Sequence, residues 1–175
     1  MKPFKSFETA RLMLKPTSEE DADLIYELLN TPKWIKFIGD RNVKSIADAQ
    51  AYIRNRMQTQ LERLGFSNYT IIDKADRVKV GICGLYDREG LEGIDLGFAL
   101  LPQHEGKGYA FEAASEIKRA AKEEFGLSFL RAITVKENVA SQKLLTKLGF
   151  GFVKNIQMPA NQEELLLFEC NNGLR

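Results

Sequence analysis

The chain has 175 residues, of which 44% are hydrophobic, and its 25 basic and 24 acidic side chains leave a net charge of +1. This length suits one domain with a sizeable core, so we expect residues 1–175 to form a single domain. The balanced charge gives no support to a nucleic-acid partner, and no run reaches the roughly 18 apolar residues that a membrane span requires. Met1 to Ser6 lack the apolar core of a signal peptide, which predicts a cytoplasmic protein.

The first half of the chain reads as a strand followed by two helices. Thr17-Ser18-Glu19-Glu20 has the pattern of a capping box, and Pro32 ends or redirects the helix that it opens. The second helix begins at Ser45 and stops at Gly65. The strand is expected at Leu12 to Lys15, ahead of both helices.

The second half alternates strands and helices. Three strands form a predicted antiparallel meander, and a helix, a strand, a further helix and a C-terminal hairpin follow them. The order strand, strand, helix, strand implies a mixed sheet covered by helices. The expected ranges are strands 67–73, 78–86, 94–101 and 129–135, helices 110–125 and 140–148, and hairpin strands 152–156 and 164–170.

The most informative segment is the glycine-rich loop from Gln103 to Ala110, between a strand and a helix. Gly106 and Gly108 permit positive φ and close approach of a ligand, while the first amides of the helix have no intrahelical acceptor. The helix dipole and Lys107 add positive charge, so the loop suits an anion. By itself the loop could equally be an ordinary turn, and its spacing matches neither the dinucleotide fingerprint nor the nucleoside-triphosphate loop.

The spacing Gln-x-x-Gly-x-Gly at 103–108 resembles the pyrophosphate-binding signature of the GNAT acetyltransferase superfamily, and Gly-Lys-Gly-Tyr-Ala-Phe-Glu-Ala at 106–113 resembles its RimJ/RimL-like subfamily, which includes ribosomal-protein N-terminal acetyltransferases. Residues 9–14, 81–85, 138–141 and 148–150 are similar to further motifs of that family, in the same order. The resemblance implies an α/β (α+β) GNAT fold, with a mixed and mostly antiparallel sheet of about six to seven strands, splayed at its centre, and helices on both faces.

The resemblance also implies acetyl-CoA as cosubstrate and no metal. In this family the pantetheine arm enters the gap beside the strand before the glycine loop, and the asparagine after the next strand bonds to it. The cofactor-binding residues that the resemblance implies are Phe98, Ala99, Leu100, Gln103, Gly106, Lys107, Gly108, Tyr109, Ala110, Asn138 and Ser141. Asn138 could also be the cap of a helix, accepting from the Ser141 amide.

Acetyl transfer needs a base for the amine, donors for the oxyanion and an acid for the leaving thiolate. Asp95 stands where the subfamily often has glutamate, so it is the candidate base; it could equally be a structural carboxylate. His104 is better explained as a solvated loop residue. The family tyrosine that protonates the thiolate is missing from residues 144–148, which leaves Ser141 or water as the acid.

Cys83 lies in an apolar run and Cys170 near the C-terminus, without a Cys-x-x-Cys or Cys/His grouping. We expect two reduced thiols and no metal site.

For the acceptor, the resemblance points to the region after the first helix, where Trp34, Phe37 and Asp40 are candidate substrate-binding residues. The two aromatic side chains could instead belong to the core, and Asp40 could hold an ammonium group. A peptide N-terminus, an aminoglycoside, a polyamine and a small amine metabolite all fit. We expect a direct-transfer N-acetyltransferase, monomeric or homodimeric. The alternatives are a non-catalytic acyl-CoA-binding regulatory module and an enzyme acting on RNA-linked aminoacyl groups, which the charge balance does not favour.

Overall fold

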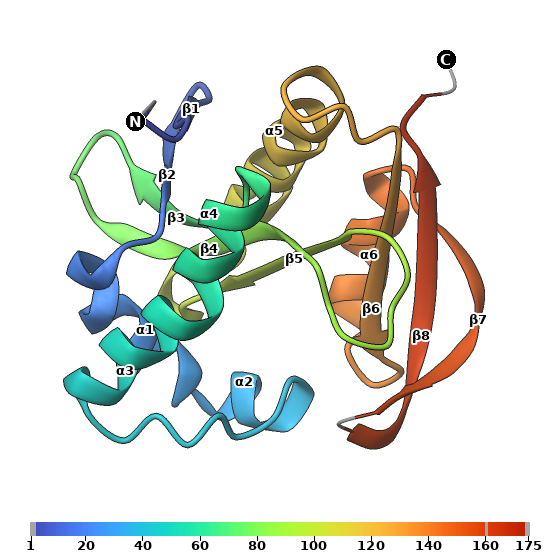
Figure 1. Ribbon diagram of the computed structural model, residues 1–175, viewed down its shortest axis with the longest axis horizontal. Coiled ribbons are helices and arrows are strands. Elements are labelled where there is room, and N and C mark those ends of the chain that lie inside the picture. The colour runs from blue at the N-terminus through green and yellow to red at the C-terminus, as the bar shows by residue number, and fades with distance from the viewer. Residues whose placement is uncertain (1–2, 160, 174–175) are drawn as a thin grey trace.

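The computed structural model describes residues 3–159 and 161–173. Met1 and Lys2, which belong to the segment from which a cytoplasmic location is predicted, lie outside the described residues. One eight-stranded sheet runs through the described chain in the order β1-β2-β3-β4-β5-β6-β8-β7 (Figure 1). The strands are β1 (Phe7–Glu8), β2 (Leu12–Pro16), β3 (Asn68–Asp73), β4 (Lys79–Tyr86), β5 (Asp95–Leu100), β6 (Phe129–Val135), β7 (Gly151–Met158) and β8 (Asn161–Asn171). The sequence predicted about six to seven strands. β1 was not among them, because this edge strand has two residues and is too short to show a periodic pattern.

The helical elements are η1 (Glu19–Asp21), α1 (Ala22–Leu29), α2 (Pro32–Phe37), α3 (Ile46–Tyr52), η2 (Ile53–Gln58), α4 (Thr59–Leu64), η3 (Pro102–His104), α5 (Tyr109–Glu123) and α6 (Val139–Lys147). The predicted helix between Ser45 and Gly65 is therefore one continuous segment, α3 to α4, with a π-helical middle. Short elements α2 and η3 were not predicted. The first helix begins one residue later than its expected capping box, because Ser18 is the N-cap and its amide donates to Asp21 at 3.0 Å.

The sheet divides between β5 and β6. These strands run parallel and are paired only through Asp95 and Arg131, where the Arg131 amide donates to the Ile94 carbonyl at 2.8 Å. All other neighbouring strands are antiparallel, with longer registers on either side of the division. Beyond the single pair, β5 turns away from β6 (Figure 1). The expected mixed, centrally splayed sheet is thus confirmed.

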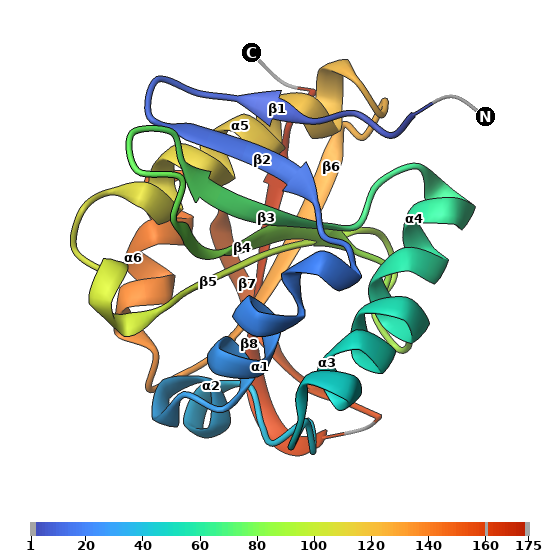
Figure 2. The same ribbon diagram turned by 90° about the vertical axis from the view of Figure 1, so that its left-hand side faces the viewer.

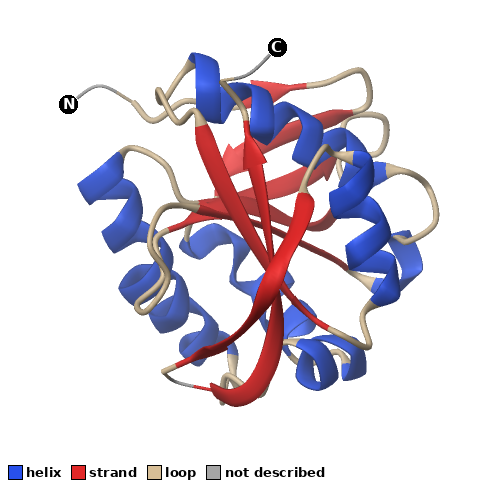
Figure 3. Cartoon of the chain, turned by 90° about the vertical axis from the view of Figure 1, so that its right-hand side faces the viewer, coloured by secondary structure: helices blue, strands red, loops and turns tan. Residues whose placement is uncertain are grey.

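Helices cover both faces, as expected. Figure 2 shows β2 to β5 between α5 on one side and α1 and α3 on the other. The α1 and α3 side is closed by an apolar cluster that includes Leu28, Trp34 and Ile53. On the far side of the division, the long hairpin of β7 and β8 crosses in front of the other strands when viewed from that side (Figure 3).

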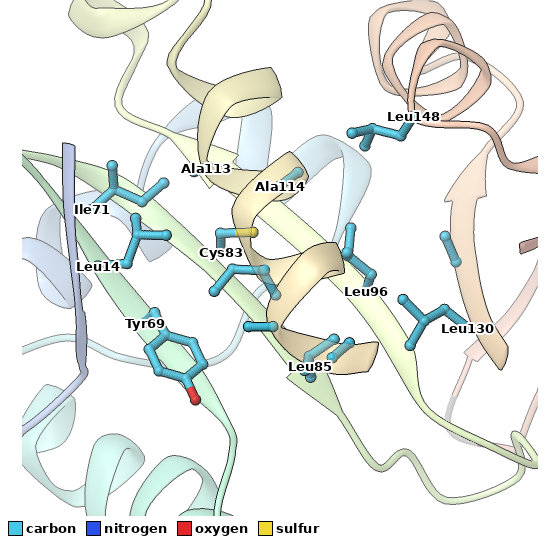
Figure 4. Close-up of a cluster of buried hydrophobic side chains, with 14 of the residues drawn as sticks. Leu14, Tyr69, Ile71, Cys83, Leu85, Leu96, Ala113, Ala114, Leu130 and Leu148 are labelled. Atoms are coloured by element: carbon cyan, nitrogen blue, oxygen red, sulfur yellow. The ribbon is translucent and has the colours of Figure 1, made fainter. Parts of the chain in front are cut away.

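The larger core lies between the sheet and α5. Ala113, Ala114 and Ile117 are fully buried on α5, and the small alanines allow the helix to approach the strands closely (Figure 4). Cys83 of β4 points into this cluster, and α6 adds Leu148 from the edge. This packing fixes the direction of α5 and therefore the position of its N-terminus next to β5.

Candidate active site

A cleft of about 420 Å³ lies where β5 turns away from β6. Its walls come from β5, the glycine loop with the first turn of α5, the start of α6, and α2. Eleven residues predicted for cofactor or substrate line it: Trp34, Phe37, Phe98, Ala99, Leu100, Gly106, Gly108, Tyr109, Ala110, Asn138 and Ser141. The structure therefore brings together segments that are about a hundred positions apart in the sequence.

The glycine loop has the backbone shape that an anion site needs. Gly106 and Gly108 have φ values of 75° and 81°, in the left-handed region that disfavours residues with a Cβ. The first helical hydrogen bond runs from the Glu112 amide to the Gly108 carbonyl at 3.1 Å. Within the described chain, the amides from Gly106 to Phe111 have no acceptor. This row of free donors at the positive end of α5 suits the pyrophosphate of coenzyme A.

A network from β2 and β3 supports the loop. The Arg11 Nη1 atom donates to the Lys107 carbonyl at 2.8 Å, and the guanidinium lies 4.7 Å from the centre of the Tyr109 ring. The Tyr109 hydroxyl in turn donates to Asp73. Arg11 also pairs with Glu112 at 3.3 Å, which makes that carboxylate part of the scaffold. Sequence analysis assigned Arg11 no such role, because a contact across 96 positions leaves no local pattern.

Two predicted cofactor residues do not line the cleft. The Gln103 side chain is exposed and donates to Glu27 at 3.2 Å, which ties η3 to α1. Lys107 is exposed, and its backbone carbonyl serves Arg11. His104 lies in η3 and also has no place in the lining, in agreement with the decision against a catalytic role.

The β5 wall supplies backbone groups. Phe98, Ala99 and Leu100 pair with β4 along one edge of β5. The opposite edge has lost its partner strand after Asp95 and faces the gap, so its backbone groups are open to a ligand that takes the place of a strand.

The α6 wall supplies polar side chains. The Asn138 side chain accepts from the Ser141 amide at 3.2 Å, so the expected helix cap is present. The same two residues line the cleft, and the Ser141 hydroxyl has no partner among the described residues. Leu144 and Lys147 continue this face one and two turns further on. Their spacing from Ser141 was a readable signal that the sequence analysis did not use.

Asp95 lies at the start of β5, with its side chain only 2% exposed and outside the lining of the cleft. Its Oδ2 atom accepts from Arg88 Nε, while Oδ1 is buried without a hydrogen-bond partner among the described residues. Burial raises the pKa of the Asp95 carboxyl, and the Arg88 charge opposes part of that rise. The predicted base is thus a buried carboxylate in an ion pair, at the end of β5 that is farther from the glycine loop.

The acceptor wall is only partly as predicted. Trp34 is 9% exposed, so it belongs both to the apolar cluster and to the wall, and Phe37 is half-buried there. Asp40 lies outside the lining and is exposed, and it accepts from the Asn42 amide at 2.8 Å. Lys33 of α2 bridges to Glu105 of the glycine loop at 3.0 Å, which links the two walls. The sequence did not predict Lys33, Glu105 or Phe111 as site residues, because no pattern along the chain connects α2 with the glycine loop.

Among residues 3–159 and 161–173 there is no group of three or more His, Cys, Asp or Glu side chains that could hold a metal ion. None of the helices in this part of the chain is both long and apolar enough to cross a membrane.

A split sheet with a glycine loop at one end of the gap defines the class of acyl-coenzyme A transferases that the sequence resembles. The family model for the acetyltransferase (GNAT) domain matches residues 11–151. The chain belongs to this family, and the acetyltransferase class expected from the sequence is confirmed. As a member of it, the protein is an N-acetyltransferase that uses acetyl-CoA.

The chain is 26% identical to the uncharacterized N-acetyltransferase YoaA of Bacillus subtilis over 148 residues, which cover 84% of this chain and 83% of that protein. A GNAT-family acetyltransferase from Bordetella pertussis has the same fold, with a TM-score of 0.79 at 21% identity over 95% of this chain and 99% of that one. RimL, a ribosomal α-N-protein acetyltransferase solved in complex with coenzyme A, gives a TM-score of 0.79 at 12% identity over 96% and 99% of the two chains. These likenesses confirm the GNAT fold.

Proposed function

We propose that the protein transfers the acetyl group of acetyl-CoA directly to the primary amine of a small molecule or a peptide, in a ternary complex. The observation that carries this proposal is a single cleft, which is lined by the glycine loop with its free amides, by β5, by the start of α6 and by the aromatic side chains of α2. A thioester donor and an amine acceptor can meet in such a cleft.

The donor is proposed to bind mainly through backbone groups. The amides from Gly106 to Phe111 hold the pyrophosphate, and the free edge of β5 pairs with the pantetheine amides, assisted by the Asn138 side chain. A backbone amide of β5 at the gap would also donate to the oxyanion, a contribution of about 3 kcal/mol in other enzymes.

The proposed proton transfers use Asp95 and Ser141. The Asp95 carboxylate receives the amine proton through water, since the side chain is buried and does not reach into the cleft. The amine nitrogen forms a bond to the thioester carbonyl carbon, the carbon–sulfur bond breaks, and the thiolate takes a proton from the Ser141 hydroxyl or from water. A thiol pKa of about 8.5 makes modest help sufficient at this last step.

Both cysteines favour direct transfer over an acyl-enzyme. Cys83 is fully buried in the core, and this burial raises the pKa of its thiol to about 12. Cys170 is buried as well. A buried thiol is shielded from a thioester donor, so neither side chain is suited to carry an acetyl group.

We further assign the chain to the RimJ/RimL-like subfamily, on the motif at 106–113 and the structural likeness to RimL. A cytoplasmic location and a monomeric or homodimeric state remain predictions from the sequence.

Release of free thiol from acetyl-CoA across a broad panel of primary amines tests the proposal. We expect amine-dependent release with at least one member of the panel. Binding of acetyl-CoA without release for any amine would instead support the alternative, a non-catalytic acyl-CoA-binding module.

A further inference from the structure

Arg88 lies over the first half of β5, the half farther from the glycine loop. It follows β4, and its Nη2 atom lies 3.9 Å from the position that a Cβ would take on Gly97. Ala99 lies two positions on, so it shares the face of β5 with Gly97, and it lines the cleft. The guanidinium therefore lies over β5 beside the part of the strand that forms the cleft.

The Arg88 guanidinium packs on a platform, which is formed by the Tyr86 ring and the two strands beneath it. It lies 4.9 Å from the centre of the Tyr86 ring. A Cβ on Gly84 would come within 2.8 Å of the Tyr86 hydroxyl, and one on Gly97 within 2.9 Å of the Tyr86 ring. Only glycine at these two positions lets the ring lie against the sheet, so the platform depends on the backbone of both strands.

Tyr86 is itself anchored in a buried polar network. Its hydroxyl donates to the Asn68 side chain, whose Nδ2 atom donates to the Thr17 hydroxyl at 2.8 Å. Asn68 and Thr17 are 1% and 2% exposed. Because fully satisfied buried networks are rigid, the ring beneath Arg88 has a fixed position.

Only one edge of the Arg88 guanidinium is occupied. The Nε atom donates to the buried Asp95, and the side chain is 36% exposed. Its terminal nitrogens, Nη1 and Nη2, have no acceptor among the described residues. Held on one side by Asp95 and below by Tyr86, the guanidinium presents two fixed donors, which is the arrangement that binds a carboxylate well.

We propose that Arg88 binds a carboxylate of the acceptor, so that the acceptor is an amine with a carboxylate only a few bonds away. Alternate residues of a strand share a face and are about 6 to 7 Å apart, so an anion over Gly97 and an amine beside Ala99 are close neighbours. A free α-amino acid, or a peptide N-terminus with an acidic residue at its first or second position, has this chemistry. A polyamine lacks the carboxylate and would bring further positive charge to Arg88. This inference rests on the proposed function and specifies its acceptor.

The test compares acceptors in matched pairs by kcat/KM. An amino acid is paired with its carboxamide, and a dipeptide amide that has glutamate is paired with one that has glutamine. We expect the carboxylate member of at least one pair to be preferred by about 10- to 100-fold, the range for a hydrogen bond to a charged group. The pair that shows the preference identifies the source of the carboxylate.

Arg88→Gln should abolish this preference, so that kcat/KM becomes equal for the two members of the pair even where loss of the Asp95 partner lowers both values. Arg88→Lys should restore part of the preference. Arg63→Gln is the matched control, since Arg63 is an exposed arginine paired with Asp87 at 2.8 Å, and it should leave the preference unchanged. If Arg88→Gln does not fold, Arg88→Lys is measured in its place, because it keeps a cation beside Asp95 but loses the two parallel donors and should lower the preference.

The outcomes separate the two proposals. Acetylation of amines without any preference for a carboxylate overturns the inference and leaves the N-acetyltransferase proposal standing. A preference that survives Arg88→Gln, or that is undiminished in Arg88→Lys where that variant replaces it, does the same. Coenzyme A binding without acetylation of any acceptor overturns the proposed function itself.

Discussion

The two walls of the cleft present different chemical groups, backbone amides on one side and side chains on the other. The donor wall consists of backbone amides from Gly106 to Phe111 and the free edge of β5, and Arg11 and Tyr109 hold it in place. The acceptor wall consists of side chains from α2, while Arg88 and Asp95, which are proposed to act on the acceptor, lie at the start of β5 outside this lining. A backbone site needs a particular spacing of glycines and so leaves a motif, whereas a side-chain site can change its specificity by single substitutions. The comparison explains why the donor is better defined than the acceptor.

The largest expected effect concerns catalysis on the acceptor side of the cleft. If Asp95 is the base, Asp95→Asn should lower kcat/KM by about 10²- to 10⁴-fold while coenzyme A affinity stays unchanged. Steady-state kinetics and titration calorimetry measure the two quantities. Asp87→Asn is the matched control, since Asp87 pairs with Arg63 on the surface. Unchanged turnover in Asp95→Asn would leave Asp95 only its structural role as the partner of Arg88.

The next largest effect concerns coenzyme A binding on the donor side of the cleft. Gly108→Val should weaken coenzyme A binding by about 100-fold, because a Cβ is strained at φ 81° and would obstruct the approach of the phosphates. Calorimetric titration with coenzyme A measures it. Gly126→Val is the control, since Gly126 has φ 68°, open space around it and a position at the far end of α5. Equal loss of affinity in both variants would show a general effect on α5 instead of a blocked site.

A smaller effect concerns stability. The folded-state pKa of Asp95 is raised above the ordinary value of 3.8, so this carboxyl binds its proton more tightly in the folded protein than in the unfolded chain. Its contribution to the free energy of unfolding is therefore complete below pH 3.8 and is lost as the pH rises through the raised value. Urea unfolding of the wild type and Asp95→Asn across pH 3 to 7 should show this slope in the wild type only. A parallel dependence in both proteins would contradict the raised pKa.

The smallest expected effect compares what the backbone amides and the Lys107 charge each contribute to coenzyme A binding. Lys107 is exposed, so Lys107→Ala should weaken coenzyme A binding only about threefold, and high salt should remove the difference by screening. Affinity measured at low and high ionic strength checks this. A loss comparable to that of Gly108→Val would make the lysine, and not the backbone, the main phosphate ligand.

The sequence predicted most of the fold because its signals were local. Gly65 and Gly126 follow the ends of helices, the meander of β3 to β5 is antiparallel as expected, and the glycine loop lies between β5 and α5. The elements that were missed, β1 and α2, are two and six residues long, too short for a periodic pattern.

The candidate site divides in the same way. Most predicted cofactor residues line the cleft, since a motif encoded them. Asp40 and Gln103 lie elsewhere, and the Lys33–Glu105 bridge and the Arg88–Tyr86 platform were not foreseen. These contacts join segments through tertiary packing, which spacing along the chain cannot show.

Hydrogen exchange of the amides from Gly106 to Phe111, measured with and without coenzyme A, tests the central claim most directly. The structure gives these amides no acceptor of their own among the described residues, so they should exchange rapidly in the free protein and become protected when phosphate oxygens accept from them. Slowing confined to this row and to the open edge of β5 is the predicted result. Saturation with coenzyme A that leaves the exchange of these amides unchanged would contradict the account.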